Sequence, residues 1–284
     1  MRKVIFGLGT AASLIAFPAL AEGQKAQVPD EVIAAQRSAL AATTEGKGFG
    51  PQSPRDIDRR EGRNQRSFAT APDITEMTLC DIHLHRSAEH KGGEFTTYAG
   101  NGDARGHGTG FKYDGALTEA ELAPVGHAIG DPHYGGLAPG DTIEIHFAHS
   151  TAAATLGHSL MTCLSDMVKN PQLRVEALIA VLVNDPNAAD FTEIARIEEI
   201  NSLKQVPNLP DDLGTPVVYD GSTTGPSHNE TASPYQVTWS VRPRVLKINI
   251  NSVEAWLADN EFSEHHAHGV RNLVTNPDLL APID

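Results

Sequence analysis

The stretch Thr78-Leu-Cys-Asp-Ile-His-Leu-His85 alternates between polar and apolar residues, which is the pattern of a β-strand with one buried face. A second stretch with the same period, Thr142-Ile-Glu-Ile-His-Phe-Ala-His149, follows later in the chain. Residues two apart in a strand point to the same face, so His83 and His85 share a face, and Glu144, His146 and Ala148 share one in the second strand. If the two strands are near neighbours, three imidazole rings meet on one side of a sheet.

Further strand patterns surround these two stretches, and helix patterns are few. A nearly all-apolar run, Val175–Val183, predicts a strand buried on both faces. Asp190 is expected to cap a helix that runs through Ile200, and Ser252 one that runs through Asn260. We therefore expect an α+β, mainly β fold, with a large, twisted, mostly antiparallel central sheet and a few short peripheral helices. The remaining predicted strands are Val217–Tyr219, Tyr235–Val241 and Val245–Ile250.

The composition limits the classes of function. The chain has 284 residues, 40% of them hydrophobic, which is enough to bury a core. Its net charge of −14 argues against nucleic acid as a partner, because phosphate binding needs a cationic face. Two cysteines cannot build a disulfide-rich scaffold or a four-cysteine zinc site, but 13 histidines are unusual.

The first 21 residues have the pattern of an export signal. Arg2 and Lys3 precede an apolar run, and Ala19-Leu-Ala21 fits a signal-peptidase site, so we expect cleavage after Ala21 and a periplasmic or secreted protein. A membrane anchor is the alternative, although the run is short and interrupted, and no later stretch would span a bilayer. Export into an oxidising compartment would allow Cys80 and Cys163 to pair; two buried free thiols are the alternative. Residues 22–47 are expected to form a leader with a short helix, and residues 48–284 a single domain.

The three converging histidines fit a metal site. Three neutral imidazoles suit a catalytic zinc ion that keeps its fourth position open. Asp81 and Glu144 share the faces of the histidines, where a carboxylate can accept the outer N–H of a ligand and fix its orientation. Core or surface histidines are the alternative, since H-x-H alone is a weak signal.

The other histidines receive no firm role. His265-His266-Ala-His268 is a second possible cluster, but it lacks an obvious facing carboxylate and we expect a solvated turn. An exposed histidine near the metal would serve as a proton shuttle. His90 and His107, the latter in the glycine-rich loop Asn101–Gly110, are the candidates.

Seven short elements resemble, in the same order, elements of the carbonic anhydrases. Cys80–His90 (CDIHLHRSAEH) is similar to the signature of the delta class, and the rest resembles the alpha class. The alpha-like elements are Gln52–Ile57 (QSPRDI, similar to Q-S-P-x-D-I), His83–His85 (HLH, similar to F-H-F-H), Ser87–His90 (SAEH, similar to S-E-H), Glu144–His149 (EIHFAH, similar to E-L-H-L-V-H), Ala180–Leu182 (AVL), Tyr219–Pro226 (YDGSTTGP, similar to Y-P-G-S-L-T-T-P) and Val237–Val241 (VTWSV, similar to V-T-W-I-V).

The resemblance implies a zinc-dependent carbonic anhydrase with a sheet of the alpha-carbonic-anhydrase type. Residues 48–284 would be its catalytic domain, and a zinc-bound hydroxide would hydrate carbon dioxide reversibly to bicarbonate and a proton. The Zn²⁺ ligands would be His83, His85 and His146, with Asp81 behind the first ligand and Glu144 behind the third.

The resemblance also implies roles for the residues around the metal. The Thr224 hydroxyl would accept a hydrogen bond from the hydroxide and donate one to Glu89. The carbon dioxide pocket would be lined by Ala148, Val181, Thr223 and Trp239.

The chain departs from the alpha class in several places. The segment between His85 and His146 is much longer, so we expect the glycine-rich region 92–140 to loop out and to cover the mouth of the site. Glu89 follows His85 by only four residues, which is a shorter spacing than in the alpha class. No N-G-H element for a proton shuttle precedes His83.

Two other functions stay open on sequence grounds. A metal-dependent hydrolase of the amidohydrolase type also begins with H-x-H, but it calls for a repeating βα barrel. A non-enzymatic, histidine-rich zinc- or copper-binding protein would hold several metal ions in flexible loops.

Overall fold

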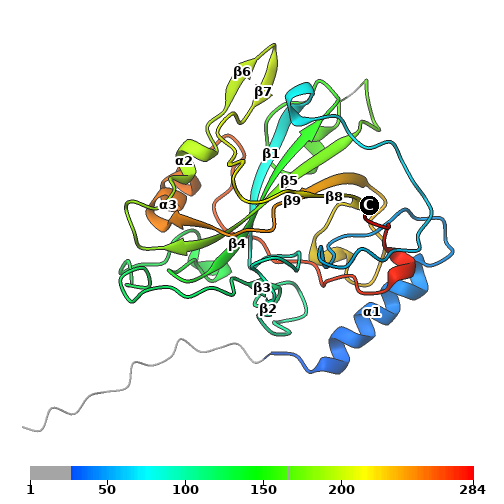
Figure 1. Ribbon diagram of the computed structural model, residues 1–284, viewed down its shortest axis with the longest axis horizontal. Helices are drawn as coiled ribbons and strands as arrows, with labels where there is room; N and C mark the ends of the chain where they lie inside the picture. The colour runs from blue at the N-terminus through cyan, green and yellow to red at the C-terminus, as the bar shows by residue number, and fades with distance from the viewer. Residues whose placement is uncertain (1–26, 166) are drawn as a thin grey trace, which may run out of the picture.

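The computed structural model describes residues 27–165 and 167–284, and the predicted signal peptide lies outside them. At its centre lies a six-stranded sheet (Figure 1). Strand β5 pairs in parallel with β9 and with β10, while the other three pairings are antiparallel. The prediction of a mainly β fold with a mostly antiparallel sheet is therefore confirmed. The strand order is β1 (Thr78–Arg86), β4 (Thr142–Ser150), β5 (Leu173–Val183), β9 (Gln236–Val241) and β8 (Val217–Ser222), with β10 (Leu246–Asn249) also beside β5.

The pairing of β1 with β4 brings the two histidine-bearing strands together. His83 lies directly opposite His146, and His85 lies opposite Glu144. His149 pairs with Leu79 and so points to the other face, as predicted. The register therefore places all three candidate ligands on one face of the sheet.

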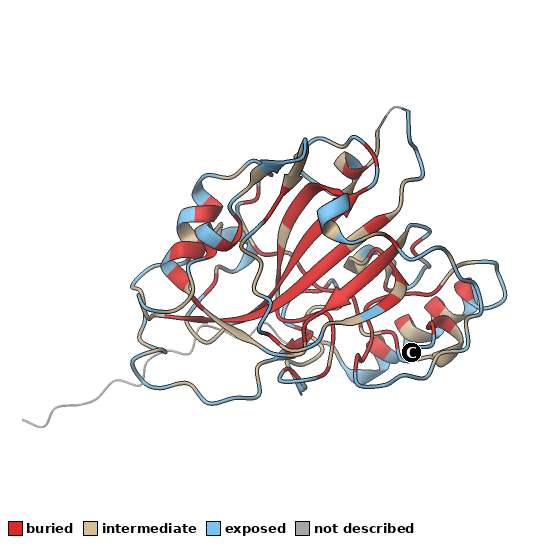
Figure 2. Ribbon diagram, turned by 45° about the horizontal axis from the view of Figure 1, so that its top comes forward, coloured by how far each residue is buried: buried red, intermediate tan, exposed pale blue. Residues whose placement is uncertain are grey.

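Strand β5 forms the centre of the sheet and is buried along almost its whole length (Figure 2). One face of the sheet packs around Leu178 and Phe147, together with Trp256 and Leu257 of helix α3 (Ile250–Ala258). The opposite face, which carries the histidines, packs around a second cluster that includes Trp239. The site thus stands on a sheet that is fixed by apolar packing on both sides.

Helices are short and lie at the periphery, but two were predicted with the wrong bounds. Helix α2 (Phe191–Ile194) is capped by Asp190 as expected, yet it ends early and Ile200 lies in strand β6 (Glu198–Ile200). Helix α3 is capped by Asn249 rather than by Ser252, whose hydroxyl donates to the Asn249 carbonyl oxygen. Short helical turns are η1 (Ile74–Glu76), η2 (Pro132–Tyr134), η3 (Leu160–Cys163), η4 (Pro226–His228) and η5 (Pro277–Leu279), and the remaining strands are β2 (Thr97–Tyr98), β3 (Phe111–Lys112) and β7 (Leu203–Gln205).

The predicted leader contains helix α1 (Asp30–Thr44), which lies beside the C-terminal segment (Figure 1). Leu40 packs with Val274 and Leu279, and the Gln36 side chain accepts a hydrogen bond from Asn272 at 2.7 Å. The helix is thus part of the folded body.

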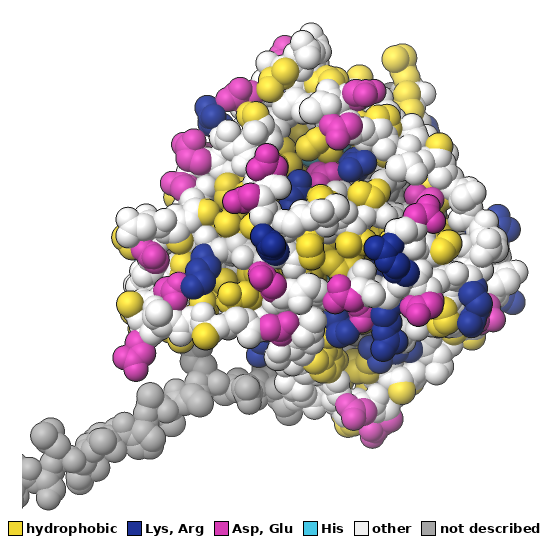
Figure 3. All heavy atoms as spheres, viewed as in Figure 1, with side chains coloured by type: hydrophobic (Ala, Val, Ile, Leu, Met, Phe, Trp, Pro, Cys, Tyr) yellow, Lys and Arg dark blue, Asp and Glu magenta, His cyan; other side chains and the backbone are white. Residues whose placement is uncertain are grey.

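Within residues 27–165 and 167–284, no helix is both long and apolar enough to cross a bilayer. Figure 3 shows Asp and Glu side chains spread among basic and apolar ones over one face, in keeping with the net charge of −14.

A disulfide joins β1 to the loop between β4 and β5. It links Cys80 to Cys163 in η3, so of the two alternatives for the cysteines the pairing is confirmed. Two hydrogen bonds to the Cys80 carbonyl oxygen, from the Gly157 amide at 3.3 Å and the Thr162 hydroxyl at 3.1 Å, hold the same loop against β1. The part of this loop from Gly157 to Cys163 is therefore tethered next to the histidine face of the sheet.

Candidate metal centre

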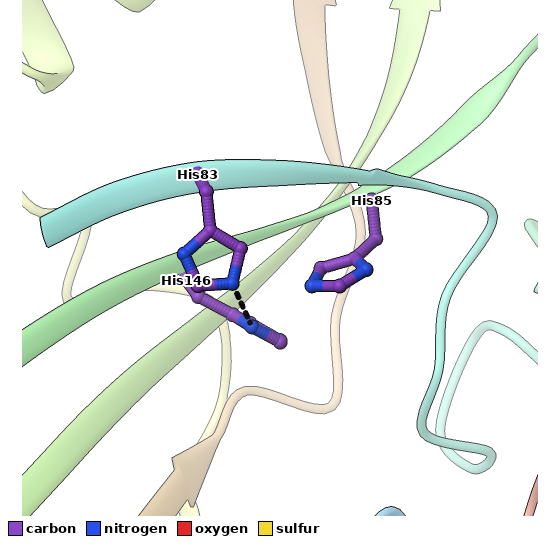
Figure 4. Close-up of side chains that lie close together, drawn as sticks. All are labelled: His83, His85 and His146. Atoms are coloured by element: carbon purple, nitrogen blue, oxygen red, sulfur yellow. Dashed lines mark hydrogen bonds between the residues drawn. The ribbon is translucent and has the colours of Figure 1, made fainter. Parts of the chain in front are cut away.

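Three imidazole rings meet where β1 and β4 pair (Figure 4). The ring centroids are 5.0 Å apart for His83 and His85, 4.9 Å for His83 and His146, and 4.6 Å for His85 and His146. One nitrogen of each ring lies within 4.8 Å of one nitrogen of each other ring. We call these three residues the β1/β4 triad.

The outer nitrogen of each ring has a hydrogen-bond acceptor. His83 Nδ1 lies 2.7 Å from Asp81 Oδ2, His146 Nε2 lies 2.8 Å from Glu144 Oε1, and His85 Nδ1 lies 3.0 Å from a backbone oxygen, that of Gly269. Because carboxylate and carbonyl oxygens only accept, each outer nitrogen carries the proton. The inner nitrogens, His83 Nε2, His85 Nε2 and His146 Nδ1, are therefore left with lone pairs that face one another.

These inner nitrogens fit a tetrahedral metal ion. His83 Nε2 and His146 Nδ1 lie 3.1 Å apart, the hydrogen bond dashed in Figure 4; without a metal ion a proton on one of the two nitrogens makes this bond, and when that proton leaves, both lone pairs are free to bind a cation. With zinc–nitrogen bonds of about 2.0–2.1 Å, tetrahedral geometry separates two ligand nitrogens by roughly 3.3 Å. His85 Nε2 is buried and has no hydrogen-bond partner. The donor set of three neutral imidazoles therefore fits zinc.

Burial keeps two of the three ligands neutral. It lowers the pKa of His146 to about 4 and holds the pKa of His85 well below its ordinary value. Burial also acts to lower the pKa of His83, but the Asp81 carboxylate outweighs it and raises that pKa. Metal binding at the triad must therefore displace a proton chiefly from His83.

Glu144 lies behind the third ligand and also contacts His90. Burial acts to raise the pKa of the Glu144 carboxyl group, but His90 and His146 hold it well below its ordinary value. Glu144 Oε1 lies 2.6 Å from His90 Nδ1, and Glu144 Oε2 accepts the backbone N–H groups of Glu89 and His90 at 2.8 and 3.1 Å. The carboxylate is thus saturated with donors and stays charged.

Glu89 and Thr224 come together beside the triad. Glu89 is fully buried, and its Oε1 accepts the Arg271 backbone N–H at 2.7 Å. Burial raises the pKa of the Glu89 carboxyl group, while the nearby His146, the Thr224 hydroxyl and the Arg271 N–H oppose the rise. Glu89 Oε2 is buried and has no hydrogen-bond partner. It is therefore the oxygen that is free to accept from Thr224.

A cavity of about 550 Å³ opens onto two of the three rings of the triad. Asp81, His83 and His85 line it together with Thr223 and Thr224, whereas His146 lies behind them and does not. The disulfide-linked loop supplies an apolar wall with Leu160, Met161 and Leu164, next to Leu173 of β5. No residue of the region 92–140 lines this cavity, so the expectation that this insertion covers the mouth is wrong.

The sequence matches the family model of the delta carbonic anhydrases over residues 74–252. The chain belongs to the delta carbonic anhydrase family. Members of this family are carbonate dehydratases, so membership implies that class of enzyme. The matched region contains the β1/β4 triad, Glu89 and Thr224.

Solved alpha-class structures also match, at low similarity. An alpha-carbonic anhydrase from Photobacterium profundum is 17% identical, with 80% of this chain and 88% of that chain covered and a TM-score of 0.28. The Thermovibrio ammonificans alpha-carbonic anhydrase in complex with the inhibitor sulfanilamide is 14% identical. The match covers 76% of this chain and 83% of that chain, with a TM-score of 0.25. A hyperthermostable carbonic anhydrase identified from an active hydrothermal vent chimney is 17% identical, with 81% of this chain and 87% of that chain covered and a TM-score of 0.29. No curated protein matches the chain.

The pocket predicted from the alpha-class resemblance is only partly assembled in this delta carbonic anhydrase. Thr223 lines the cavity, Ala148 is buried opposite Asp81, and the Trp239 ring lies 4.9 Å from that of His146. Val181 is misplaced, because Val175 is the residue of β5 that pairs with both Ala148 and Trp239. The two valines are six positions apart along the strand, or about 20 Å, so Val181 lies away from the site.

The two proton-shuttle candidates do not meet the need for exposure at the cavity. His90 is fully buried, with Nδ1 on Glu144 and Nε2 2.7 Å from the Tyr219 hydroxyl oxygen, so the expectation of an exposed shuttle there is wrong. Its role is to brace Glu144. His107 is exposed, but it is not among the residues that line the cavity.

Three cavity residues were missed by sequence reasoning. His158, Glu264 and His268 line the same cavity, and Glu264 Oε2 lies 2.8 Å from His268 Nε2. The second histidine cluster therefore does have a carboxylate partner. The available signal was the position of Glu264 four residues before His268, but no strand or helix period applies in this irregular segment.

Proposed function

We propose that the chain is a zinc-dependent carbonic anhydrase that interconverts carbon dioxide and bicarbonate in the cavity above the β1/β4 triad. The observation that carries the proposal is the convergence of three inner imidazole lone pairs, each fixed by a hydrogen bond at its outer nitrogen. Family membership supports the same reaction class.

Zinc would be held by His83, His85 and His146 and would supply a Lewis acid that lowers the pKa of a bound water to about 7, a value for which carbonic anhydrase is itself the reference example. Asp81 and Glu144 orient the first and third ligands by accepting their outer protons. Neutral imidazoles leave the full charge of the metal ion available to water and substrate.

Thr224 and Glu89 orient the nucleophile and the substrate. A buried Glu89 carboxylate can only accept, so the Thr224 hydroxyl donates to it. The Thr224 oxygen then presents only a lone pair to the cavity and can only accept a hydrogen bond there. This one-way arrangement admits a protonated oxygen and disfavours a group that has no hydrogen to donate.

The apolar wall suits a substrate such as carbon dioxide, which offers little to hydrogen-bond. Leu173 lies in the same apolar cluster as Ala148, Val175 and Trp239. The Trp239 ring of this cluster lies directly beside the His146 ring. These side chains exclude water from one side of the triad. Export to the periplasm or beyond forms part of the proposal, and the Cys80–Cys163 disulfide supports it.

The alternative functions lack such support. The mixed, mostly antiparallel sheet is not the βα barrel that an amidohydrolase-type hydrolase requires. A carrier of several metal ions needs separate ligand sets. In residues 27–165 and 167–284, both groups of three metal-capable side chains include His146, so they describe one centre.

A stopped-flow assay of carbon dioxide hydration, with and without a sulfonamide, tests the proposal when zinc is measured on the same sample. We expect about one zinc ion per chain and hydration that the sulfonamide inhibits. A sample with one zinc ion per chain and no hydration activity would overturn the proposal, and several loosely bound ions would favour the carrier.

A further inference from the structure

The hydration reaction, if the proposed function holds, releases one proton in the cavity for each bicarbonate formed. Carbon dioxide and water give bicarbonate and a proton, so the proton must reach the buffer before the next cycle. The described residues that line the cavity include neither Lys nor Arg. Among the residue types that line the cavity, histidine is the one whose ordinary pKa lies closest to neutrality, so it is best suited to pass this proton on.

His158 stands at the rim of this cavity. Its side chain is 61% exposed, and it lines the same cavity as His83 and Thr224. It belongs to the loop between β4 and β5 that the Cys80–Cys163 disulfide holds against β1, and the neighbouring Gly157 amide donates to the Cys80 carbonyl oxygen. The ring thus reaches both the cavity and the bulk solvent from a fixed base.

A buried carboxylate faces the His158 ring. Glu264 is 3% exposed, and its Oε1 lies 3.6 Å from His158 Nδ1. Its backbone is held by Asn260, whose side chain accepts the Glu264 N–H at 3.0 Å and donates to the Glu264 carbonyl oxygen at 2.7 Å. The other carboxylate oxygen, Oε2, lies beside His268 Nε2. Glu264 is thereby positioned to stabilise a positive charge on His158.

We propose that His158 is the proton acceptor at the exit of the cavity and that Glu264 is its positioning residue. A proton released in the cavity passes through water to His158 Nε2, while Nδ1–H points to Glu264. The resulting imidazolium returns the proton from its exposed ring to a buffer base, which restores neutral His158. No other bond is made or broken.

The charges around His158 favour this role. Asp81 and Glu264 are the carboxylates of the cavity, while its other titratable groups are Tyr235 and the histidines His83, His85, His228 and His268. Burial and the nearby Arg271 lower the pKa of His228, which keeps that ring neutral on the opposite wall. The acceptor therefore sees two carboxylates and no fixed cation among the lining residues.

The kinetic test compares His158→Ala with the wild-type protein in a weak buffer. We expect kcat to fall about tenfold with kcat/KM within twofold, because only proton export is slowed, and we expect free imidazole to restore kcat. An unchanged kcat in weak buffer, with an active wild-type protein, would overturn the inference. If the wild-type protein is itself inactive, the proposed function fails instead.

A matched control is available outside the cavity. His127 is 53% exposed and pairs with Glu254 at 2.7 Å, so it shares the exposure and the carboxylate partner of His158 but not its place. His127→Ala should leave kcat and its buffer dependence unchanged. An equal loss in His127→Ala would show that the effect is not specific to the cavity.

A second variant tests Glu264. In Glu264→Gln we expect kcat in weak buffer to fall with kcat/KM within twofold, and free imidazole to restore kcat, because the carboxylate that faces the His158 ring is gone. The double variant His158→Ala/Glu264→Gln should be no slower than His158→Ala, since Glu264 acts only through that ring. A wild-type kcat of Glu264→Gln in weak buffer would remove Glu264 from the proposal.

Discussion

Two histidine clusters in this chain have similar ring spacings but differ in what they can bind. In the β1/β4 triad the centroids lie 4.6 to 5.0 Å apart. In the second cluster His265 and His266 lie 4.9 Å apart, and His266 and His268 lie 4.6 Å apart. Yet His266 stacks on Tyr134 at 3.8 Å, and His265 Nδ1 faces the Ser263 carbonyl oxygen at the surface. Only the triad turns three lone pairs to one point.

The difference shows that ring proximity does not make a metal site. Strand register fixes where the triad rings start, and acceptors at the outer nitrogens fix which nitrogen is free. In the second cluster the chain is irregular and the ring contacts are lateral. Substitutions inside the triad should therefore have effects that matched substitutions outside it do not.

Removing a ring from the triad should abolish both metal binding and hydration. In His146→Ala only two imidazoles remain, so we expect zinc per chain and turnover to fall to background in metal analysis and stopped-flow assays. His265→Ala, in the second cluster, should keep both. Full zinc binding in His146→Ala would contradict the ligand assignment.

Changing the group that orients the nucleophile should separate metal binding from turnover. Thr224→Ala should keep zinc and lose about 100-fold in kcat, because no hydroxyl remains to accept from the cavity and donate to Glu89. Thr224→Ser, which keeps the hydroxyl, should retain most of the rate. Wild-type rates in Thr224→Ala would place the relay elsewhere.

Weakening the acceptor behind a ligand should weaken the metal site without removing a ligand. Glu144→Gln is expected to lower zinc affinity by about 10- to 100-fold, measured by competition with a chelator. Glu254→Gln alters the exposed pair with His127 and should leave the affinity unchanged. Equal affinities in the two variants would mean that outer acceptors do not distinguish the triad.

His149 lies outside both histidine clusters. Its ring is buried, and no other histidine bonds to its unpaired nitrogen. Its Nδ1 donates to the Phe147 carbonyl oxygen, its Nε2 has no partner, and burial lowers its pKa from 6.5 to about 4. Between these values the unfolded chain binds a proton that the folded chain does not. Stability from this group is therefore complete above about pH 6.5 and falls by on the order of 3 kcal/mol as the pH drops to 4.

Chemical unfolding at several pH values measures this loss. His149→Gln should show a flatter decline of the unfolding free energy between pH 6.5 and pH 4 than the wild-type protein. An identical decline in both proteins would assign the acid sensitivity to other groups.

The sequence predicts the sheet and the triad well because both depend on a period of two. His83, His85 and His146 follow from alternation alone, and their convergence needs only that β1 and β4 are neighbours. Val181 was misplaced because it came from the resemblance of Ala180–Leu182 to A-V-L, and an all-apolar strand has no alternation against which to check that register. Val175, its true counterpart at the site, appears only when β5 is aligned with β4.

The wall of the cavity could not be predicted in the same way. His158 and Glu264 come from irregular segments more than 100 residues apart, which meet because a disulfide and an Asn260 turn hold them in place. His90 was predicted to be an exposed shuttle, but it is buried, with one ring nitrogen bonded to Glu144 and the other to Tyr219. Long-range packing decided these positions, and a local pattern does not encode it.

Zinc K-edge X-ray absorption on the purified protein identifies the atoms that hold the metal. With one zinc ion per chain, we expect three imidazole nitrogens at about 2.0–2.1 Å and one further light-atom ligand. A first shell with sulfur, or with fewer than three imidazoles in the protein as purified, would contradict it.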